Sequence, residues 1–273
     1  MLSLCAGYCS GYAPRMAIFH SGGLSLAYDD IPPAGAPRGT VVLVHGFATN
    51  RAENWRRLGW LTALGRTGYR AVALDLRGHG ESDKPRDPAA YARGEMVGDI
   101  IALLDQLDLG RVDLLGYSMG AHLSLAVALN APGRVSNLIL GGVGERLLTG
   151  APISETTMTM AEALTVEDAG VITDPTLRGF RQFAENQGED RLALAACSQG
   201  RGHPVSADDL SGLSVPTLVV AGDRDEIAGA PQALADAIPG AKAVALPACD
   251  HFSAIPHALF KAAVFDFLEG WEE

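Results

Sequence analysis

The stretch from Val112 to Val127 reads VDLLGYSMGAHLSLAV, and it decides the fold. An apolar run of strand length leads directly into Gly116-Tyr117-Ser118-Met119-Gly120, and a helical pattern of Leu and Ala follows. A serine displayed on a sharp strand-to-helix turn needs small neighbours, because the backbone is strained and the strand and helix lie close together. Two glycines also occur in ordinary turns, but the position between a strand and a helix favours a nucleophile.

On both sides of this motif, short apolar runs alternate with segments of helical period. The predicted strands are Met16 to His20, Thr40 to His45, Arg70 to Asp75, Val112 to Gly116, Val135 to Gly141, Val215 to Gly222 and Ala241 to Leu246. Most of them are apolar throughout, as strands buried on both faces are. The alternation predicts an α/β fold with a mostly parallel sheet covered by helices on both faces.

The alternation breaks at residues 145–205, where Pro, Gly, Thr and acidic residues precede two short helical stretches. We interpret residues 145–205 as a small helical cap inserted into a domain made of residues 16–144 and 206–273. Residues 1–15 precede the first predicted strand, and we expect them to form a loose N-terminal extension. They lack the basic and apolar regions of a signal peptide, so we expect a cytoplasmic protein.

Composition excludes several functional classes. The chain has 273 residues, 48% of them hydrophobic, which is enough to bury a full core. Its net charge of −11 argues against nucleic acid as a partner, because binding phosphates requires a basic face. No apolar stretch reaches the roughly 18 residues of a membrane span, so we expect no membrane insertion. The oligomeric state stays open between monomer and homodimer.

The sequence also predicts neither a cofactor nor a metal. Gly78-His79-Gly80 and Gly142-Val143-Gly144 lack the third glycine of a dinucleotide-binding motif, and there is no Gly-Lys-Ser/Thr phosphate loop. No His-Glu-x-x-His pair is present, and the four cysteines are not spaced as zinc ligands. We interpret the cysteines as free thiols.

A serine hydroxyl is a weak nucleophile at neutral pH, so it needs a histidine to accept its proton and a carboxylate to orient that histidine. Asp223 and Asp225 come directly after the predicted strand that ends at Gly222, and His251 follows the last predicted strand. The candidates therefore occur in the chain order Ser, Asp, His, each after a strand.

This order resembles the α/β-hydrolase family, and the resemblance covers the chain from about Met16 to its last helix. Val44-His45-Gly46-Phe47 is similar to the family's oxyanion loop after the third strand, and residues 75–82, DLRGHGES, are similar to the loop after the fourth. The resemblance implies an α/β-hydrolase fold with an eight-stranded, mostly parallel sheet flanked by helices.

The resemblance also implies roles for particular residues. The family's Gly-x-x-Asp pattern selects Asp225 over Asp223 as the acid, with Glu145 as a fallback, and the loop before the last helix selects His251 rather than His257 as the base. The backbone N–H groups of Phe47 and Met119 are the expected oxyanion donors. Other histidines have structural interpretations: we expect His45 and His79 to brace glycine loops by hydrogen bonds, and His122 to be packed.

A serine at position 118 argues against dehalogenase and epoxide hydrolase chemistry, because those members of the family use an aspartate nucleophile. The sequence therefore predicts a serine esterase that cleaves short-chain or small aryl esters, with Trp55, Met158, Phe180 and Phe183 as candidate pocket walls. The open alternatives with the same triad are a lactonase, a perhydrolase, an amidase and a carbon-carbon bond hydrolase. A last alternative is a non-catalytic binding protein.

The carbon-carbon bond hydrolase hypothesis makes a further demand on the sequence. It requires a basic residue in the pocket to hold the carboxylate of a dienoate-type ketone. Arg178, Arg181 and Arg191, all in the predicted cap, are the candidates for that residue.

Overall fold

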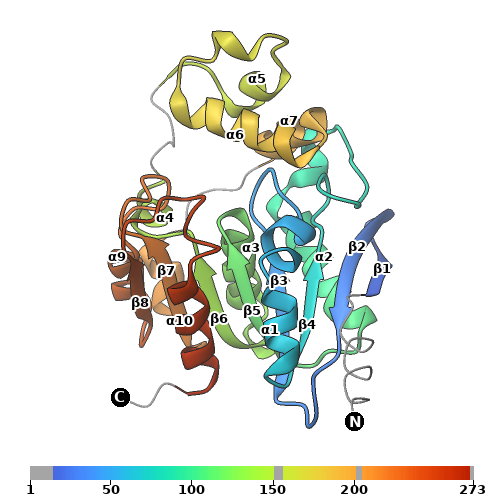
Figure 1. Ribbon diagram of the computed structural model, residues 1–273, viewed down its shortest axis with the longest axis vertical. Helices are drawn as coiled ribbons and strands as arrows, with labels where there is room; N and C mark the ends of the chain where they lie inside the picture. The colour runs from blue at the N-terminus through green and yellow to red at the C-terminus, as the bar shows by residue number, and fades with distance from the viewer. Residues whose placement is uncertain (1–14, 151–155, 201–204, 271–273) are drawn as a thin grey trace, which may run out of the picture.

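The computed structural model describes residues 15–150, 156–200 and 205–270, and in them an eight-stranded sheet lies between two layers of helices (Figure 1). The strands are β1 (Arg15–Ser21), β2 (Leu24–Ile31), β3 (Gly39–Val44), β4 (Tyr69–Leu74), β5 (Val112–Tyr117), β6 (Val135–Gly141), β7 (Thr217–Gly222) and β8 (Lys242–Leu246). Their order is β1-β2-β4-β3-β5-β6-β7-β8, with β1 and β2 antiparallel to their neighbours and the other pairs parallel. The predicted fold class is confirmed.

Strand β2 was not among the strands that the periodicity predicted. Its sequence, LSLAYDDI, mixes apolar residues with serine and two aspartates, so it lacks the continuous apolar run of the central strands. It pairs antiparallel with β1 and β4 near the edge of the sheet, where polar side chains have access to water or to ion partners. Asp29 of β2 is fully buried because Arg51 and Arg56 pair with it.

Two apolar clusters, one on each face of the sheet, form the core. Alternate residues of β3 divide between them: Val42 and Val44 join one cluster, and Val41 and Leu43 join the other. Helices α2 (Arg93–Gln106), α3 (Met119–Asn130) and α9 (Pro231–Asp236) cover the first face, and α1 (Trp60–Arg66) and α10 (Ala258–Leu268) cover the second. The central strands are therefore buried on both faces, as their composition predicts.

The parallel strands end on the same side of the sheet, where ligands bind in open α/β folds. Three short helices lie in the segments that connect the strands: η1 (Ala52–Arg56), η2 (Pro88–Tyr91) and η3 (Pro132–Arg134). Above these strand ends lie the helices of the predicted cap, α5 (Met160–Thr165), α6 (Pro175–Gln187) and α7 (Arg191–Gln199) (Figure 1). None of the helices in the described part of the chain is long and apolar enough to cross a membrane.

The segment between β6 and β7 contains α4 (Glu145–Thr149), α5 (Met160–Thr165), η4 (Ala169–Val171), α6 (Pro175–Gln187), α7 (Arg191–Gln199) and α8 (Ala207–Ser211). Local signals set the bounds of α6: Asp174 caps its first turn, Pro175 occupies the first position, and Gly188 ends it in the left-handed region. The predicted N-terminal extension, apart from Arg15, lies outside the described residues, as do Cys5 and Cys9. Cys197 and Cys249 are buried, and neither forms a disulfide with another described residue.

Candidate active site

Ser118 occupies a strained turn between β5 and α3. Its φ of 53° and ψ of −114° lie outside the regions that L-residues favour, and its N–H donates to the Gly141 carbonyl at 2.8 Å. A Cβ on Gly116 would clash with the carbonyl of Gly120, and a Cβ on Gly120 would clash with that of Val44. The two glycines therefore allow the strand and helix to approach, which is the reason for their spacing in the sequence.

Three side chains from separate loops form a hydrogen-bonded chain. His251 Nε2 lies 2.9 Å from Ser118 Oγ, and His251 Nδ1 lies 2.8 Å from Asp225 Oδ2. Because the carboxylate only accepts, the neutral imidazole donates from Nδ1 and is left with Nε2 as the acceptor for the serine proton. The second oxygen of Asp225 accepts the N–H groups of Ile227 and Ala228 at 3.0 and 2.9 Å, so the carboxylate cannot rotate freely.

The geometry separates the competing acids and bases. Asp225 is buried, whereas Asp223 and Glu145 are exposed. His257 caps α10, where its Nδ1 accepts the N–H of Leu259 at 3.3 Å. The residues that the family pattern selects, Asp225 and His251, are thus the ones that the structure brings to Ser118.

Tyr117 fixes the loop that carries His251. The Tyr117 hydroxyl donates to the His251 carbonyl at 2.6 Å, and its ring packs against the imidazole with 5.6 Å between centroids. Burial raises the pKa of Tyr117 well above its usual value, so the hydroxyl stays a donor. The residue next to the serine therefore sets the position of the histidine backbone.

Hydrogen bonds also fix the loop of Phe47. Asn54 Oδ1 accepts the N–H of Gly46 at 2.9 Å. His45 Nδ1 lies 2.7 Å from the Gly46 carbonyl, and its Nε2 accepts the N–H of Leu76 at 3.0 Å, so His45 must be neutral with the proton on Nδ1. Burial, together with the neighbouring His79, lowers the pKa of His45 well below its usual value. As predicted, His45 braces the loop backbone.

His79 plays a similar part in the loop after β4. Its Nδ1 lies 3.0 Å from the Arg77 carbonyl, and its ring contacts those of His45 and Phe47. Burial is the main cause that lowers its pKa to about 4, with a smaller contribution from Lys84. Neutral histidines therefore support both loops at neutral pH.

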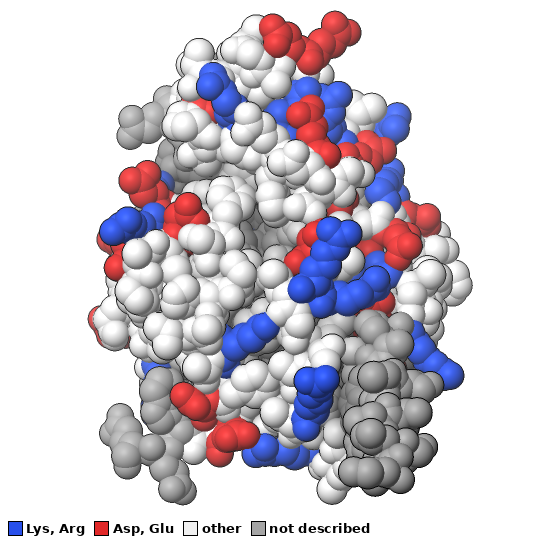
Figure 2. Space-filling view, viewed as in Figure 1, with Lys and Arg blue, Asp and Glu red and all other residues white. Residues whose placement is uncertain are grey.

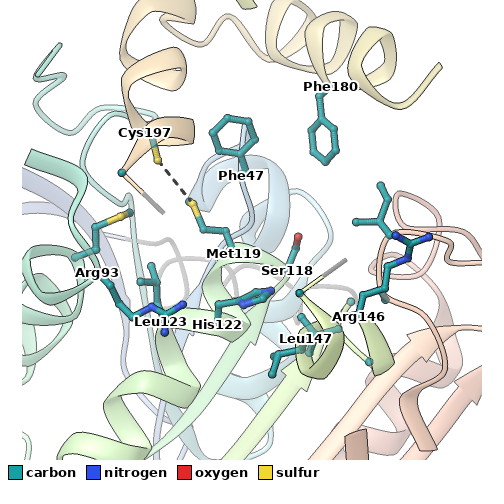
Figure 3. A pocket seen from close by; sticks show the side chains of 18 of the residues that line it. Phe47, Arg93, Ser118, Met119, His122, Leu123, Arg146, Leu147, Phe180 and Cys197 are labelled. Carbon is teal, nitrogen blue, oxygen red and sulfur yellow. Dashed lines mark hydrogen bonds between the residues drawn. The ribbon is translucent and has the colours of Figure 1, made fainter. Parts of the chain in front are cut away.

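A cavity of about 320 Å³ opens above Ser118. Its walls are mostly apolar and include Phe47, Met96, Met119, Leu123, Val143, Leu147 and Phe180. The Cys197 thiol of α7 donates to Met119 Sδ at 3.9 Å, which joins the cap to the residue after the serine (Figure 3). In the space-filling view, a hollow lies between the cap and the core, and uncharged residues form most of its rim, with charged residues on one side (Figure 2). The serine hydroxyl therefore faces a partly enclosed, largely apolar chamber.

The residues predicted to form the pocket wall lie in different places in the structure. Phe180 lines the cavity, and Phe47 and Met119, the predicted oxyanion donors, line it beside Ser118. Phe183 packs instead against Phe252, and Met158 packs against the apolar core.

The prediction that Trp55 forms a wall of the pocket is wrong. This residue is fully buried on the other face of the sheet, edge-to-face with Trp60, and so is not a pocket wall. An aromatic residue near a glycine loop in sequence carries no signal of which face it packs on.

The three candidate arginines of the cap are also not the basic residue of the pocket. Arg178 donates to the Ile172 carbonyl, Arg181 to two carbonyls of the α5 segment at 2.8 Å, and Arg191 to the Leu164 carbonyl at 3.3 Å. These three guanidinium groups hold the cap backbone together and do not line the cavity.

Sequence reasoning missed the basic groups that do line the cavity. They are Arg93 at the start of α2, His122 in α3 and Arg146 in α4. His122 is half-buried and faces the cavity rather than being packed away from it (Figure 3). No motif marks these positions. Within the described residues, no group of three or more His, Cys, Asp or Glu side chains is arranged to hold a metal ion.

Comparison with known proteins agrees with this fold. Residues 39–164 match the model of the alpha/beta hydrolase fold family. A 2-hydroxy-6-oxononadienedioate/2-hydroxy-6-oxononatrienedioate hydrolase of Cupriavidus pinatubonensis is 31% identical, over 86% of this chain and 88% of its own length. Epoxide hydrolase 2 of Siraitia grosvenorii is 40% identical over 36% of this chain, and that match spans only 30% of the relative's length.

Among solved structures, a hydrolase from Pseudomonas aeruginosa has a TM-score of 0.74 and 26% identity, covering 93% of this chain and 98% of its own. The sheet order, the serine elbow and these similarities lead to one classification. The chain belongs to the α/β-hydrolase fold family.

Proposed function

We propose that this protein is a serine hydrolase that cleaves small carboxylic esters through an acyl-enzyme on Ser118. The observation that carries the proposal is the hydrogen-bonded chain from Asp225 through His251 to Ser118, at the floor of a largely apolar cavity. A nucleophile bonded to a base, which is in turn oriented by a third group, is the arrangement that acyl transfer needs.

The proposed reaction has two halves. Ser118 Oγ attacks the ester carbonyl while His251 Nε2 takes its proton, and the imidazolium then gives that proton to the departing alcohol. Water attacks the acyl-enzyme with His251 again as the base, which releases the carboxylic acid and restores Ser118. The Asp225 carboxylate accepts the Nδ1–H of His251 and stabilises the imidazolium. The N–H groups of Phe47 and Met119 are the proposed donors to the oxyanion, and each such donor contributes about 3 kcal/mol.

A specific similarity favours a second candidate, hydrolysis of a carbon-carbon bond in a dienoate-type ketone. The Cupriavidus relative, named for that kind of dioate substrate, matches over most of both chains. Ester cleavage remains the first proposal because its alcohol leaves after a single proton transfer from His251, whereas a carbon leaving group needs further stabilisation. We do not propose epoxide hydrolysis for this chain, since the residue bonded to His251 is a serine.

The test compares the wild type with Ser118→Ala on p-nitrophenyl esters of increasing acyl length, a lactone and a dienoate ketone. Short-chain ester turnover that falls by about 10⁴-fold or more in the variant supports the proposal. Turnover of the dienoate ketone alone would mean that the same three residues catalyse carbon-carbon bond hydrolysis, the second candidate function. Inactivity on every substrate would contradict both, and an unchanged Tm of Ser118→Ala rules out misfolding as the cause of its loss.

A further inference from the structure

The charge of the cavity is opposite to that of the chain. The chain carries 32 acidic and 21 basic residues apart from histidine. Among the described residues, the cavity is lined by Arg93 and Arg146 and by no aspartate or glutamate. An acidic protein whose cavity is lined by two arginine side chains, and by no carboxylate, has a local positive potential there. Such a potential favours a negatively charged ligand.

The two guanidinium groups lie on opposite sides of the nucleophile. Figure 3 shows Arg146 on one side of Ser118 and Arg93 on the other, with the His122 ring beside the Arg93 side. Both arginines are half-buried and the walls between them are apolar. In such surroundings a guanidinium group binds a carboxylate more strongly than at an open surface, because water screens the pair less.

Two fully buried arginines of this fold lie outside the cavity. Arg77 is bonded to both oxygens of Asp99 at 2.7 Å, and Arg181 is bonded to two cap carbonyls. Neither lines the cavity. Arg93 and Arg146 differ because part of each side chain forms the wall of the chamber that holds Ser118.

We propose that the site selects esters that carry a carboxylate, with Arg93 and Arg146 as its anchors. The inference rests on the proposed function and names its substrate class. A carboxylate on the acyl side or on the alcohol side of the ester reaches one of the two guanidinium groups while the ester carbonyl lies at Ser118. The apolar walls hold the carbon chain between the two points.

Matched ester pairs test the proposal. Mono-p-nitrophenyl adipate and p-nitrophenyl hexanoate differ only by a carboxylate in place of a terminal methyl on the acyl side. 4-Butyryloxybenzoate and 4-methylphenyl butyrate make the same comparison on the alcohol side. In at least one pair, the wild type is expected to have a kcat/KM about tenfold or more higher for the anionic ester, and added salt should reduce that ratio.

Arginine variants then assign the preference to its residues. In Arg146→Gln or Arg93→Gln, kcat/KM for the anionic ester of at least one pair should fall about tenfold more than kcat/KM for its neutral partner. A lysine at the same position should restore part of the preference, because it keeps the charge but not the two-point geometry. The control is Arg66→Gln, an exposed arginine at the end of α1 with the same change of charge.

The outcomes separate this inference from the proposed function. Turnover of neutral esters without an anionic preference, or with a preference that neither folded arginine variant reduces, overturns the inference and leaves the esterase proposal standing. If no ester is turned over, calorimetry on Ser118→Ala takes its place. Tighter binding of monomethyl adipate than of dimethyl adipate, lost in Arg146→Gln or Arg93→Gln, supports the carboxylate site, and equal binding overturns it.

Discussion

The loops that follow the parallel strands and the cap helix above them are held by different forces. In the loops, buried polar atoms make directional hydrogen bonds: Asn54 accepts the N–H of Gly46, and Asp225 accepts that of Ala228. Where α6 meets the His251 loop, aromatic rings make the contact. The rings of Phe180 and Phe183 lie 5.6 and 5.2 Å from that of Phe252.

The difference indicates a division of labour. A hydrogen bond weakens steeply when its angle or length changes, so the loops hold the reacting groups in one arrangement. A ring contact contributes about 0.5–1.5 kcal/mol and is satisfied by offset-stacked or edge-to-face arrangements, so it constrains the position of the cap less tightly than a hydrogen bond does. We therefore expect changes in the loops to lower kcat and changes in the cap to alter KM.

Polar contacts also connect the two regions. Glu189, in the turn between α6 and α7, accepts from Asn50 Nδ2 at 2.8 Å and from the N–H of Gly80 at 2.9 Å. Burial raises the pKa of this carboxyl, and its two donors counter that rise. Glu189 thus fixes one end of the cap to the loops after β3 and β4, while the end of the cap near Phe252 is held by contacts between aromatic rings.

The largest expected effect is that of Asp225→Asn. The amide donates to His251 or turns away, so the imidazole adopts the wrong tautomer, and kcat for a neutral ester should fall by about 10⁴-fold. Asp223→Asn makes the same change at an exposed position two residues earlier and should leave kcat nearly unchanged. Equal losses in the two variants would show that the loop as a whole, rather than the His251 partner, is responsible.

Asn54→Ala should have the next largest effect. It leaves the buried N–H of Gly46 without its acceptor, which costs about 1–3 kcal/mol of unfolding free energy, and it loosens the loop of Phe47. We expect kcat to fall by about 10- to 100-fold if Phe47 donates to the oxyanion.

Asn137→Ala is the matched control for Asn54→Ala. Asn137 donates to Asp113 at 2.8 Å, near the amino-terminal ends of β5 and β6. This variant should lose stability without losing kcat. A loss of kcat in proportion to stability in both variants would contradict a special role for the Phe47 loop. Denaturant titration and steady-state kinetics measure the two quantities.

Acid should loosen the same loops through His79. Its pKa is about 4 in the folded protein and 6.5 in the unfolded chain, so the unfolded state binds more protons between those values. Stability is therefore complete above about pH 6.5 and falls as the pH drops toward 4, by about 2 kcal/mol between pH 7 and 5 for His79 alone. Urea titrations at the two pH values measure it. His79→Gln should remove this part of the slope, and an unchanged slope would assign the acid sensitivity to other groups.

The sequence was sufficient for the fold and for the three triad positions for a local reason. Each of Ser118, Asp225 and His251 follows an apolar strand and has its own short motif, so its place at one edge of the sheet follows from the parallel topology. Strand β2 was missed because it mixes polar and apolar residues beside the edge of the sheet.

The cavity walls could not be predicted in the same way. Whether Trp55 faces the cavity or the second core cluster depends on the rotation of η1, and whether Arg181 or Arg146 reaches the cavity depends on how the cap folds onto the core. Both are set by contacts between residues far apart in the chain. Periodicity and motifs report only on neighbours in sequence, so they predicted which serine, histidine and aspartate lie together but not the chamber around them.

The smallest expected effect is that of Phe252→Ala, which tests the ring contact directly. Removing the ring takes away the contacts with Phe180 and Phe183, so KM for a neutral ester should rise about three- to tenfold while kcat changes less than twofold. Leu259→Ala removes a similarly exposed apolar side chain from α10 and should leave both constants unchanged. Because Phe252 also touches the His251 ring, a fall in kcat larger than the rise in KM would mean that this residue positions the base, and the division between loops and cap would fail at that point.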